Sequence, residues 1–79
     1  MFYLYVLKNI KGKYYIGYSS DLRQRFSHHN AGRVTATKHG RPWILHYYEA
    51  YQEKICAEDR ERKLKQRGRA WQELKKRIV

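Results

Sequence analysis

The chain has 79 residues, of which 18 are Lys or Arg and 7 are Asp or Glu, so its formal net charge at pH 7 is +11. Its single cysteine, Cys56, excludes an internal disulfide and a four-cysteine zinc site, and no run approaches the roughly 20 apolar residues of a transmembrane helix. So high a charge on so small a body favours contact with a polyanion, and nucleic acid is the polyanion that we expect.

Solubility and contact with an anionic membrane are two alternative roles for this charge. No stretch combines a basic face with a wide apolar face, so the sequence does not predict membrane binding. No signal-peptide pattern opens the chain. We expect a soluble, cytoplasmic protein that forms one domain over residues 1–79.

The first elements form a predicted hairpin. Residues 2–8 are aromatic, aliphatic and β-branched, a composition that predicts a strand. Asn9 and Gly12 indicate a turn. Residues 13–19 predict a second strand, which pairs with the first about a turn centred near Lys11.

A helix, a loop and a third strand follow in the predicted order. Asp21 or Ser20 offers an N-cap for a helix over residues 22–30. Residues 33–42 are polar and basic, contain Gly and Pro, and predict a loop. Residues 43–51 are again rich in aromatic and apolar side chains and predict a strand.

The last third of the chain predicts two helices. Residues 53–67 form a polar helical segment, Gly68 ends it, and residues 69–79 predict a final helix. The order β-β-α-β-α-α predicts an α/β (α+β) fold, in which helices flank a small three-stranded antiparallel sheet.

The hairpin predicts a group of side chains around Tyr5. Pairing about Lys11 places Tyr5 opposite Gly17, and Tyr15 becomes a diagonal neighbour of Tyr5 on the same face. Gly17 leaves a gap beside Tyr5 where a ligand or a backbone could approach. An aromatic cross-strand cluster in the core is the simpler interpretation of the same residues.

The first helix predicts two polar side chains at the edge of the core. At 100° per residue, four of its side chains share one arc: Leu22, Arg25, Phe26 and His29. Leu22 and Phe26 are the core contacts, so Arg25 and His29 border the buried side. An arginine there needs a partner or an anion, and a structural ion pair is the alternative to a functional role.

A carboxylate occupies a packed stripe of the second predicted helix. Glu61 lies on the same helical stripe as Leu64. Burying that charge is costly unless a cation, a metal ion or hydrogen bonds compensate it. A salt bridge to Arg60, Arg62 or Arg25 would do so without any catalytic role.

Together these residues resemble the GIY-YIG nuclease domain family over roughly residues 2–76. The stretch "YYIGYSSDLRQRFSHHNAG" is the most specific part, and "TKHGRPWILHYYE" followed by "AEDRERKLK" is similar to the small stand-alone members. Tyr3 stands where the family usually has glycine. Five spaced positions carry the resemblance: "YLY" at residues 3–5, "YIG" at residues 15–17, Arg25, His29 and Glu61.

The resemblance implies metal-dependent hydrolysis of phosphodiester bonds. Glu61 would hold a single divalent ion, Mg²⁺ or Mn²⁺. Arg25 would stabilise charge that develops on the scissile phosphate. Tyr5 would activate the attacking water.

The other site residues have supporting roles in this interpretation. Tyr15 would position the water or the phosphate, His29 would assist proton transfer, and Gly17 would keep the floor of the site open. Four basic side chains are predicted to hold the nucleic-acid backbone: Lys8, Lys13, Arg23 and Lys38.

A tyrosine base sets an expectation for pH dependence. The ordinary pKa of tyrosine is about 10, and Arg25 and a metal ion are expected to lower the pKa of Tyr5. Activity should then rise with pH if Tyr5 is the base.

The sequence thus predicts an endonuclease that cuts DNA with one metal ion and uses no small-molecule cofactor. The resemblance to the family implies a role in repair or recombination. A non-catalytic nucleic-acid-binding module with the same fold is the alternative. A double-strand cut would need a protein partner or a second copy of the chain.

Overall fold

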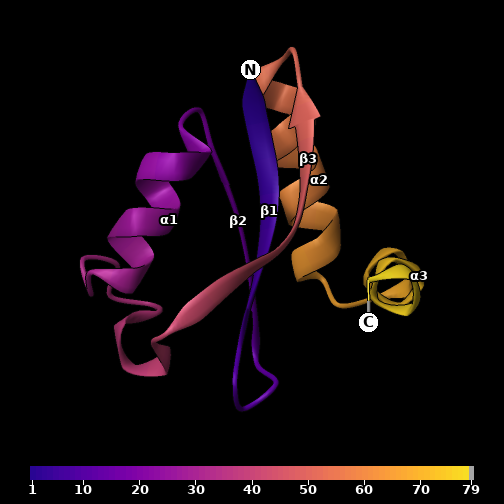
Figure 1. Cartoon of the computed structure of the whole chain (residues 1–79). Coiled ribbons are helices and arrows are strands. Elements are labelled where there is room, and N and C mark those ends of the chain that lie inside the picture. The colour runs from indigo at the N-terminus through magenta and orange to yellow at the C-terminus, as the bar shows by residue number, and fades with distance from the viewer. Residues whose placement is uncertain (79) are drawn as a thin grey trace.

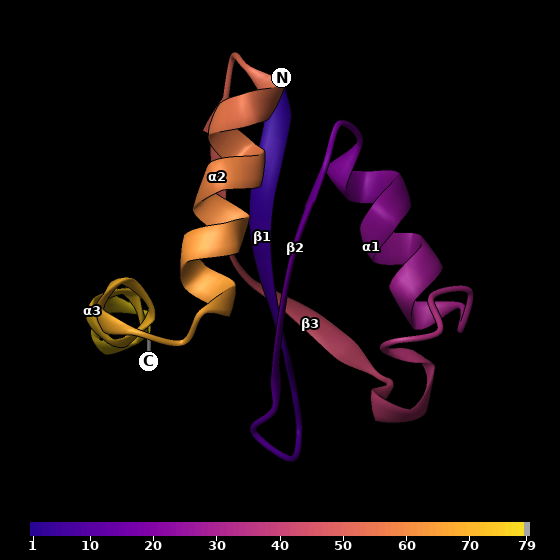
Figure 2. The same cartoon turned by 180° about the vertical axis from the view of Figure 1, so that it is seen from behind.

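The structure, a computed structural model, describes residues 1–78. Figures 1 and 2 show a sheet with helix α1 on one side and helices α2 and α3 on the other. The element order is β-β-α-β-α-α, and the fold is α+β, as the sequence predicts. Within residues 1–78, no helix has the length and apolar character needed to cross a membrane.

Strands β1 (Phe2–Asn9) and β2 (Tyr14–Ser19) form an antiparallel hairpin. The predicted register is confirmed, because Tyr5 pairs with Gly17. Strand β3 (Trp43–Tyr51) pairs antiparallel with the other side of β1, so the sheet order is β2-β1-β3. Strand β2 is therefore one edge of the sheet, and it contacts both α1 and α2.

The hairpin turn is organised by one side chain. The Asn9 side-chain oxygen accepts hydrogen bonds from the backbone N–H groups of Lys11 and Lys13, at 3.1 and 2.9 Å. These bonds place Lys13 in the turn, so β2 begins at Tyr14 and not at the predicted residue 13. Strand β1 correspondingly extends one residue further than predicted, to Asn9.

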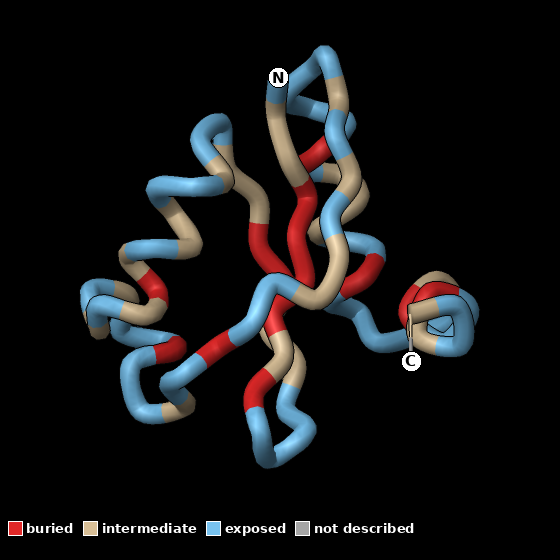
Figure 3. Tube along the Cα trace, viewed as in Figure 1, coloured by how far each residue is buried: buried red, intermediate tan, exposed pale blue. Residues whose placement is uncertain are grey.

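The central strand carries the core. Residues 4–7 of β1 are all buried, because helices or loops cover both faces of this strand. Figure 3 shows the buried segments concentrated where the strands pass between the helices. The register of β1 against β3 shifts between Val6 and Leu7, and His46 has no partner at this bulge.

The first helix begins and ends close to its predicted bounds. Helix α1 (Leu22–Asn30) starts after Asp21, whose carboxylate accepts a hydrogen bond from the backbone N–H of Gln24 at 3.0 Å. The predicted loop at 33–42 contains a short 3₁₀ helix, η1 (Lys38–Gly40), that the sequence did not indicate.

The two later helices are slightly shorter than predicted. Helix α2 (Lys54–Lys65) stops two residues before the predicted end, and Arg67 adopts a positive φ of 58° in the turn that follows. Helix α3 (Arg69–Arg77) follows Gly68. The predicted last residue of this helix, Val79, lies outside the described residues.

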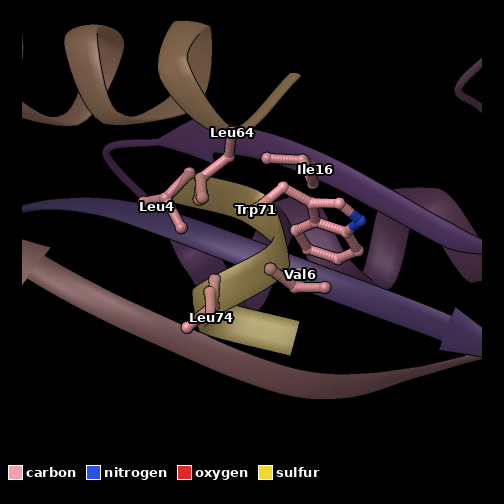
Figure 4. Packing of buried hydrophobic residues seen from close by; sticks show 6 residues of the cluster. All are labelled: Leu4, Val6, Ile16, Leu64, Trp71 and Leu74. Carbon is pink, nitrogen blue, oxygen red and sulfur yellow. The ribbon is translucent and has the colours of Figure 1, made fainter. Parts of the chain in front are cut away.

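Two apolar clusters lie on opposite faces of the sheet. The cluster under α2 and α3 includes Trp71, and Figure 4 shows its side chains converging on β1 from β2 and both helices. The cluster on the α1 side contains Tyr5, Leu7 and Trp43. Both tryptophans are core residues, as their size in so short a chain predicts.

A carboxylate on β3 ties α2 to the sheet. Glu49 accepts hydrogen bonds of 2.5 Å from the hydroxyls of Tyr47 and Tyr51 and of 3.0 and 3.1 Å from the Arg60 guanidinium. Burial acts to raise the pKa of Glu49, but these bonds outweigh it and lower the pKa. The two hydrogen bonds from the Arg60 guanidinium to Glu49 restrict rotation of α2 about its axis. They thereby orient the next residue of the helix, Glu61.

Removing this charge should destabilise the fold. We expect Glu49→Gln to lower the free energy of unfolding by about 1–3 kcal/mol, because the partly buried Arg60 loses its anionic partner. Urea denaturation followed by circular dichroism at pH 7 measures this change. Asp59→Asn is the control on α2, since its ion pairs with Arg62 and Lys63 are exposed and should contribute little. Equal stability of Glu49→Gln and the wild type would contradict this role.

Candidate active site

Side chains from four elements converge beside strand β2. The His29 ring of α1 lies against two tyrosine rings, with centroid separations of 5.6 Å to Tyr5 and 5.0 Å to Tyr15. Three side chains influence the ionisation of the Tyr5 hydroxyl: Tyr15, Arg25 and Glu61. The structure therefore brings together the five residues to which the sequence analysis assigns catalytic roles.

A buried hydrogen-bond chain runs through His29. Its Nε2 atom lies 2.7 Å from the Tyr5 hydroxyl, and its Nδ1 atom lies 2.7 Å from the Thr37 hydroxyl oxygen. Thr37 in turn donates to the backbone carbonyl of Val34 at 3.4 Å. Tyr5, His29 and Thr37 are each at most 1% exposed, so their polar groups depend on one another for hydrogen bonds.

The direction of these bonds follows from the available donors and acceptors. The Thr37 hydroxyl gives its hydrogen to Val34 and is left to accept from Nδ1–H of His29. Nε2 then carries a lone pair and accepts the hydrogen of the Tyr5 hydroxyl. The opposite tautomer would leave the Tyr5 hydrogen without an acceptor, so we assign a neutral His29 protonated at Nδ1.

The pKa of His29 is lowered and the pKa of Tyr5 is raised in the folded protein. Burial lowers the pKa of His29 to about 4, helped by the positive charges of Arg25 and His28, so the ring is neutral at pH 7. Burial also raises the pKa of Tyr5 to about 12. Arg25 opposes that increase but does not overcome it. From the sequence, Arg25 and a metal ion are expected to lower the pKa of Tyr5. With Arg25 alone, without a metal ion, the pKa is raised and this expectation is wrong.

Gly17 makes room for Tyr5 rather than for a ligand. A Cβ atom at residue 17 would lie 2.5 Å from the Tyr5 hydroxyl oxygen and 2.7 Å from its Cζ atom. The gap that the sequence predicts beside Tyr5 is thus filled by the Tyr5 ring itself. Any larger residue at position 17 would displace the hydroxyl from His29.

Glu61 faces the same region from α2. Its carboxylate pairs with the Lys65 ammonium at 3.3 Å, and its side chain is 21% exposed. Lys65 also lies 5.5 Å from the centre of the Tyr15 ring, which places this ion pair beside the tyrosines. The partners considered from the sequence, Arg60 among them, are not the ones used, because Arg60 is bound to Glu49.

Glu61 borders a surface groove of about 940 Å³ along α2. The groove is also lined by two more carboxylates, Glu58 and Asp59, and by basic side chains that include Lys65. No three His, Cys, Asp or Glu side chains of residues 1–78 gather into a metal cage. Glu61 is the least exposed of the three carboxylates, and the open groove leaves most coordination positions of any cation to water or to a ligand.

The loop before β3 fixes His29 through Thr37, to which the sequence analysis assigns no role. The Asn30 side chain pairs with the backbone of Trp43, donating to its carbonyl at 2.8 Å and accepting from its N–H at 2.7 Å. The Trp43 ring nitrogen donates to the carbonyl of Thr37 at 2.9 Å. These bonds hold Thr37 against His29, although no local pattern around Thr37 indicates this position.

The predicted nucleic-acid-binding side chains come from the hairpin, α1 and η1. Lys8 and Lys13 lie near the hairpin turn, and the Lys8 ammonium is 5.2 Å from the centre of the Tyr14 ring. Arg23 is exposed at the start of α1, and Lys38 is exposed in η1. The Asn9 side chain donates to the Gly40 carbonyl at 3.1 Å, so η1 lies beside the hairpin turn.

Known proteins resemble the chain across most of its length. The profile of the GIY-YIG catalytic domain matches residues 1–76. A UPF0213 protein of Halobacterium salinarum is 38% identical over 74 residues, which cover 92% of this chain and 96% of that protein. A UPF0213 protein of Streptococcus pyogenes serotype M3 is 37% identical over 73 residues, covering 91% and 79% of the two chains.

A solved structure shares the fold. The solution NMR structure of the UPF0213 protein BH0048 from Bacillus halodurans superposes with a TM-score of 0.57 at 29% sequence identity. The match covers 94% of this chain and 81% of that chain.

The buried neutral His29 should make stability depend on pH. Its pKa is about 4 in the folded protein and near 6.5 in the unfolded chain. Between these values only the unfolded chain binds the proton, so stability is full above pH 6.5 and is lost as pH falls towards 4. We expect the free energy of unfolding to fall by about 2 kcal/mol between pH 7 and pH 5.

Urea denaturation at the two pH values measures this change. In His29→Gln, most of the difference between pH 7 and pH 5 should disappear, whereas the control His39→Gln, which alters an exposed residue of η1, should keep it. An unchanged pH dependence in His29→Gln would show that His29 is not the responsible group.

Proposed function

The chain belongs to the GIY-YIG catalytic domain family, which is a family of nuclease type, and from this premise we propose that it is a metal-dependent endonuclease that hydrolyses phosphodiester bonds in DNA. The observation that carries the proposal is the buried hydrogen bond between Tyr5 and a neutral His29. Through this bond, His29 can accept a proton from the Tyr5 hydroxyl. The neighbours of that hydroxyl are Arg25, Tyr15 and Glu61.

Tyr5 acts in this proposal as a relay rather than as a preformed tyrosinate. With a pKa of about 12, its hydroxyl keeps its proton at pH 7. As the oxygen of Tyr5 takes a proton from the attacking water, its own proton passes along the 2.7 Å hydrogen bond to Nε2 of His29. The low pKa of His29 keeps Nε2 free to receive it.

Arg25 and Tyr15 stabilise and orient the scissile phosphate in this proposal. Arg25 lies beside the Tyr5 hydroxyl, and its permanently charged guanidinium stabilises the negative charge that grows on the phosphate oxygens as water adds. Tyr15 contacts the other flank of His29 and orients the water or the phosphate over Tyr5.

Glu61 is the residue that would hold a divalent ion. Mg²⁺ binds through one or two carboxylates and completes its shell with water and substrate phosphates, so a half-buried carboxylate at an open groove fits it. The Lys65 ammonium already occupies a cation position at this carboxylate. When bound, Mg²⁺ or Mn²⁺ would neutralise charge on the phosphate and stabilise the leaving oxygen.

The net charge of +11 supports a nucleic acid as the substrate. DNA is the nucleic acid that we propose, and the cytoplasm is the proposed location. Repair or recombination is the process that the family suggests. One observation favours the alternative of a non-catalytic binding module. The Lys65 salt bridge neutralises Glu61, and it would also suppress the repulsion between Glu61 and phosphate in a simple binder.

Incubation with labelled single-stranded, duplex and branched DNA separates the two functions. We expect cuts in Mn²⁺ or Mg²⁺ that EDTA abolishes. Glu61→Gln should lower the cleavage rate about a hundredfold or more while DNA binding persists, because the charge stabilisation by the metal is lost. Glu58→Gln, which alters an exposed residue of the same groove, should cut at nearly the wild-type rate.

Two results would contradict the enzyme. The first is salt-sensitive DNA binding by the wild type without cuts in either metal. The second is cleavage that survives in Glu61→Gln, which would place the activity elsewhere or in a contaminant.

A further inference from the structure

A second hollow, of about 540 Å³, lies between α1 and the sheet. The catalytic proposal assigns it no role. Its walls combine aromatic and apolar side chains with polar ones, of which Asp21 and Arg23 are charged. The lining side chains that matter are Tyr3, Leu22, Arg23, Phe26, Leu45 and Tyr48.

We propose that this hollow, the α1–β3 groove, seats one unpaired base of the nucleic acid whose neighbouring phosphate lies at the catalytic residues. Tyr48 provides the stacking surface, and Arg23 contacts the backbone next to the seated base. This inference rests on the proposed function and specifies its substrate as a nucleic acid with an unpaired nucleotide beside the cut.

The aromatic side chains suit a base. Tyr48 is 53% exposed on β3, although burying its ring would add to the core of so short a chain. It contacts Tyr3 edge to face, with 6.1 Å between the ring centroids, and this contact fixes the ring while leaving part of it open to solvent. Stacking on such a ring tolerates any base, since every base has a π face.

The charges favour a nucleic acid over a second copy of the chain. Arg23 is exposed and forms no ion pair with the residues that the structure describes. Asp21 also lines the groove, but its carboxylate already accepts the hydrogen bond that caps α1. A second copy would bring another charge of +11 to this surface, whereas a polynucleotide would neutralise it.

The position of the groove relates it to the catalytic residues. Tyr3 and Tyr5 lie on the same face of β1, and two residues of extended chain span about 7 Å. Tyr48 pairs directly with Tyr5 across the sheet. The two hollows also flank the turn before α1, because Tyr18 lines one and Ser20 the other. The Tyr5 hydroxyl itself lies over Gly17 of β2, so about 10 Å of sheet separates it from β3, and a base in the α1–β3 groove is one to two nucleotides from a phosphate at Tyr5.

The test measures binding without cleavage. Fluorescence anisotropy in EDTA gives the affinity of the full chain for a short single-stranded oligonucleotide and for versions with one abasic nucleotide at each position in turn. We expect at least one abasic position to weaken binding by the wild type about tenfold, since stacking of one base has effects of this size. Tyr48→Ala should weaken binding to the intact strand by a similar factor and lose the sensitivity to that abasic position.

Two variants control for indirect effects. Tyr48→Phe retains the ring and should bind like the wild type. Ile44→Ala removes an apolar side chain that is 59% exposed on the same strand but does not line the groove, and it too should bind normally. Circular dichroism confirms that each variant is folded.

Three results would overturn the base site. One is unchanged affinity in Tyr48→Ala, and another is a loss of affinity in Tyr48→Ala that is the same for intact and abasic strands. The third is a change in oligomeric state in Tyr48→Ala by sedimentation, which would assign the groove to a second copy. These outcomes are independent of the nuclease, because a chain that cuts DNA in metal can still fail the abasic test, and one that never cuts can pass it.

Discussion

The hydrogen bond between Tyr5 and His29 is the constraint on which the rest of the site depends. Both groups are buried, so each would lose a hydrogen bond without the other. The bond fixes the distance between β1 and α1, and Thr37 extends it to the loop before β3. Gly17 is required because the Tyr5 ring occupies the space where a side chain would be.

The other half of the site is fixed from the opposite side of the sheet. Glu49 holds the Arg60 guanidinium, and Glu61 is the next residue along α2. The acidic and the basic halves of the site therefore reach the edge strand β2 from two helices that the sheet separates. Each helix is attached by its own polar network, so the site needs no direct contact between α1 and α2.

The hairpin register and the helix stripes could be predicted because they follow from local periodicity. Pairing Tyr5 with Gly17 and placing His29 on the same face of the helix as Leu22 needed only the strand and helix repeats. The partners of Glu61 and Thr37 could not be predicted, since they depend on how distant elements pack. The raised pKa of Tyr5 was missed because burial outweighs the charge of Arg25, and sequence alone gives the charge but not the burial.

The protonation state of His29 tests the account most directly. A long-range ¹H–¹⁵N spectrum of ¹⁵N-labelled protein at pH 7 distinguishes a protonated ring nitrogen from one with a lone pair. The account predicts a neutral ring with the proton on Nδ1 and a lone pair on Nε2, facing the Tyr5 hydroxyl. A proton on Nε2, or a doubly protonated ring, would contradict it, because His29 could then not accept the proton of Tyr5.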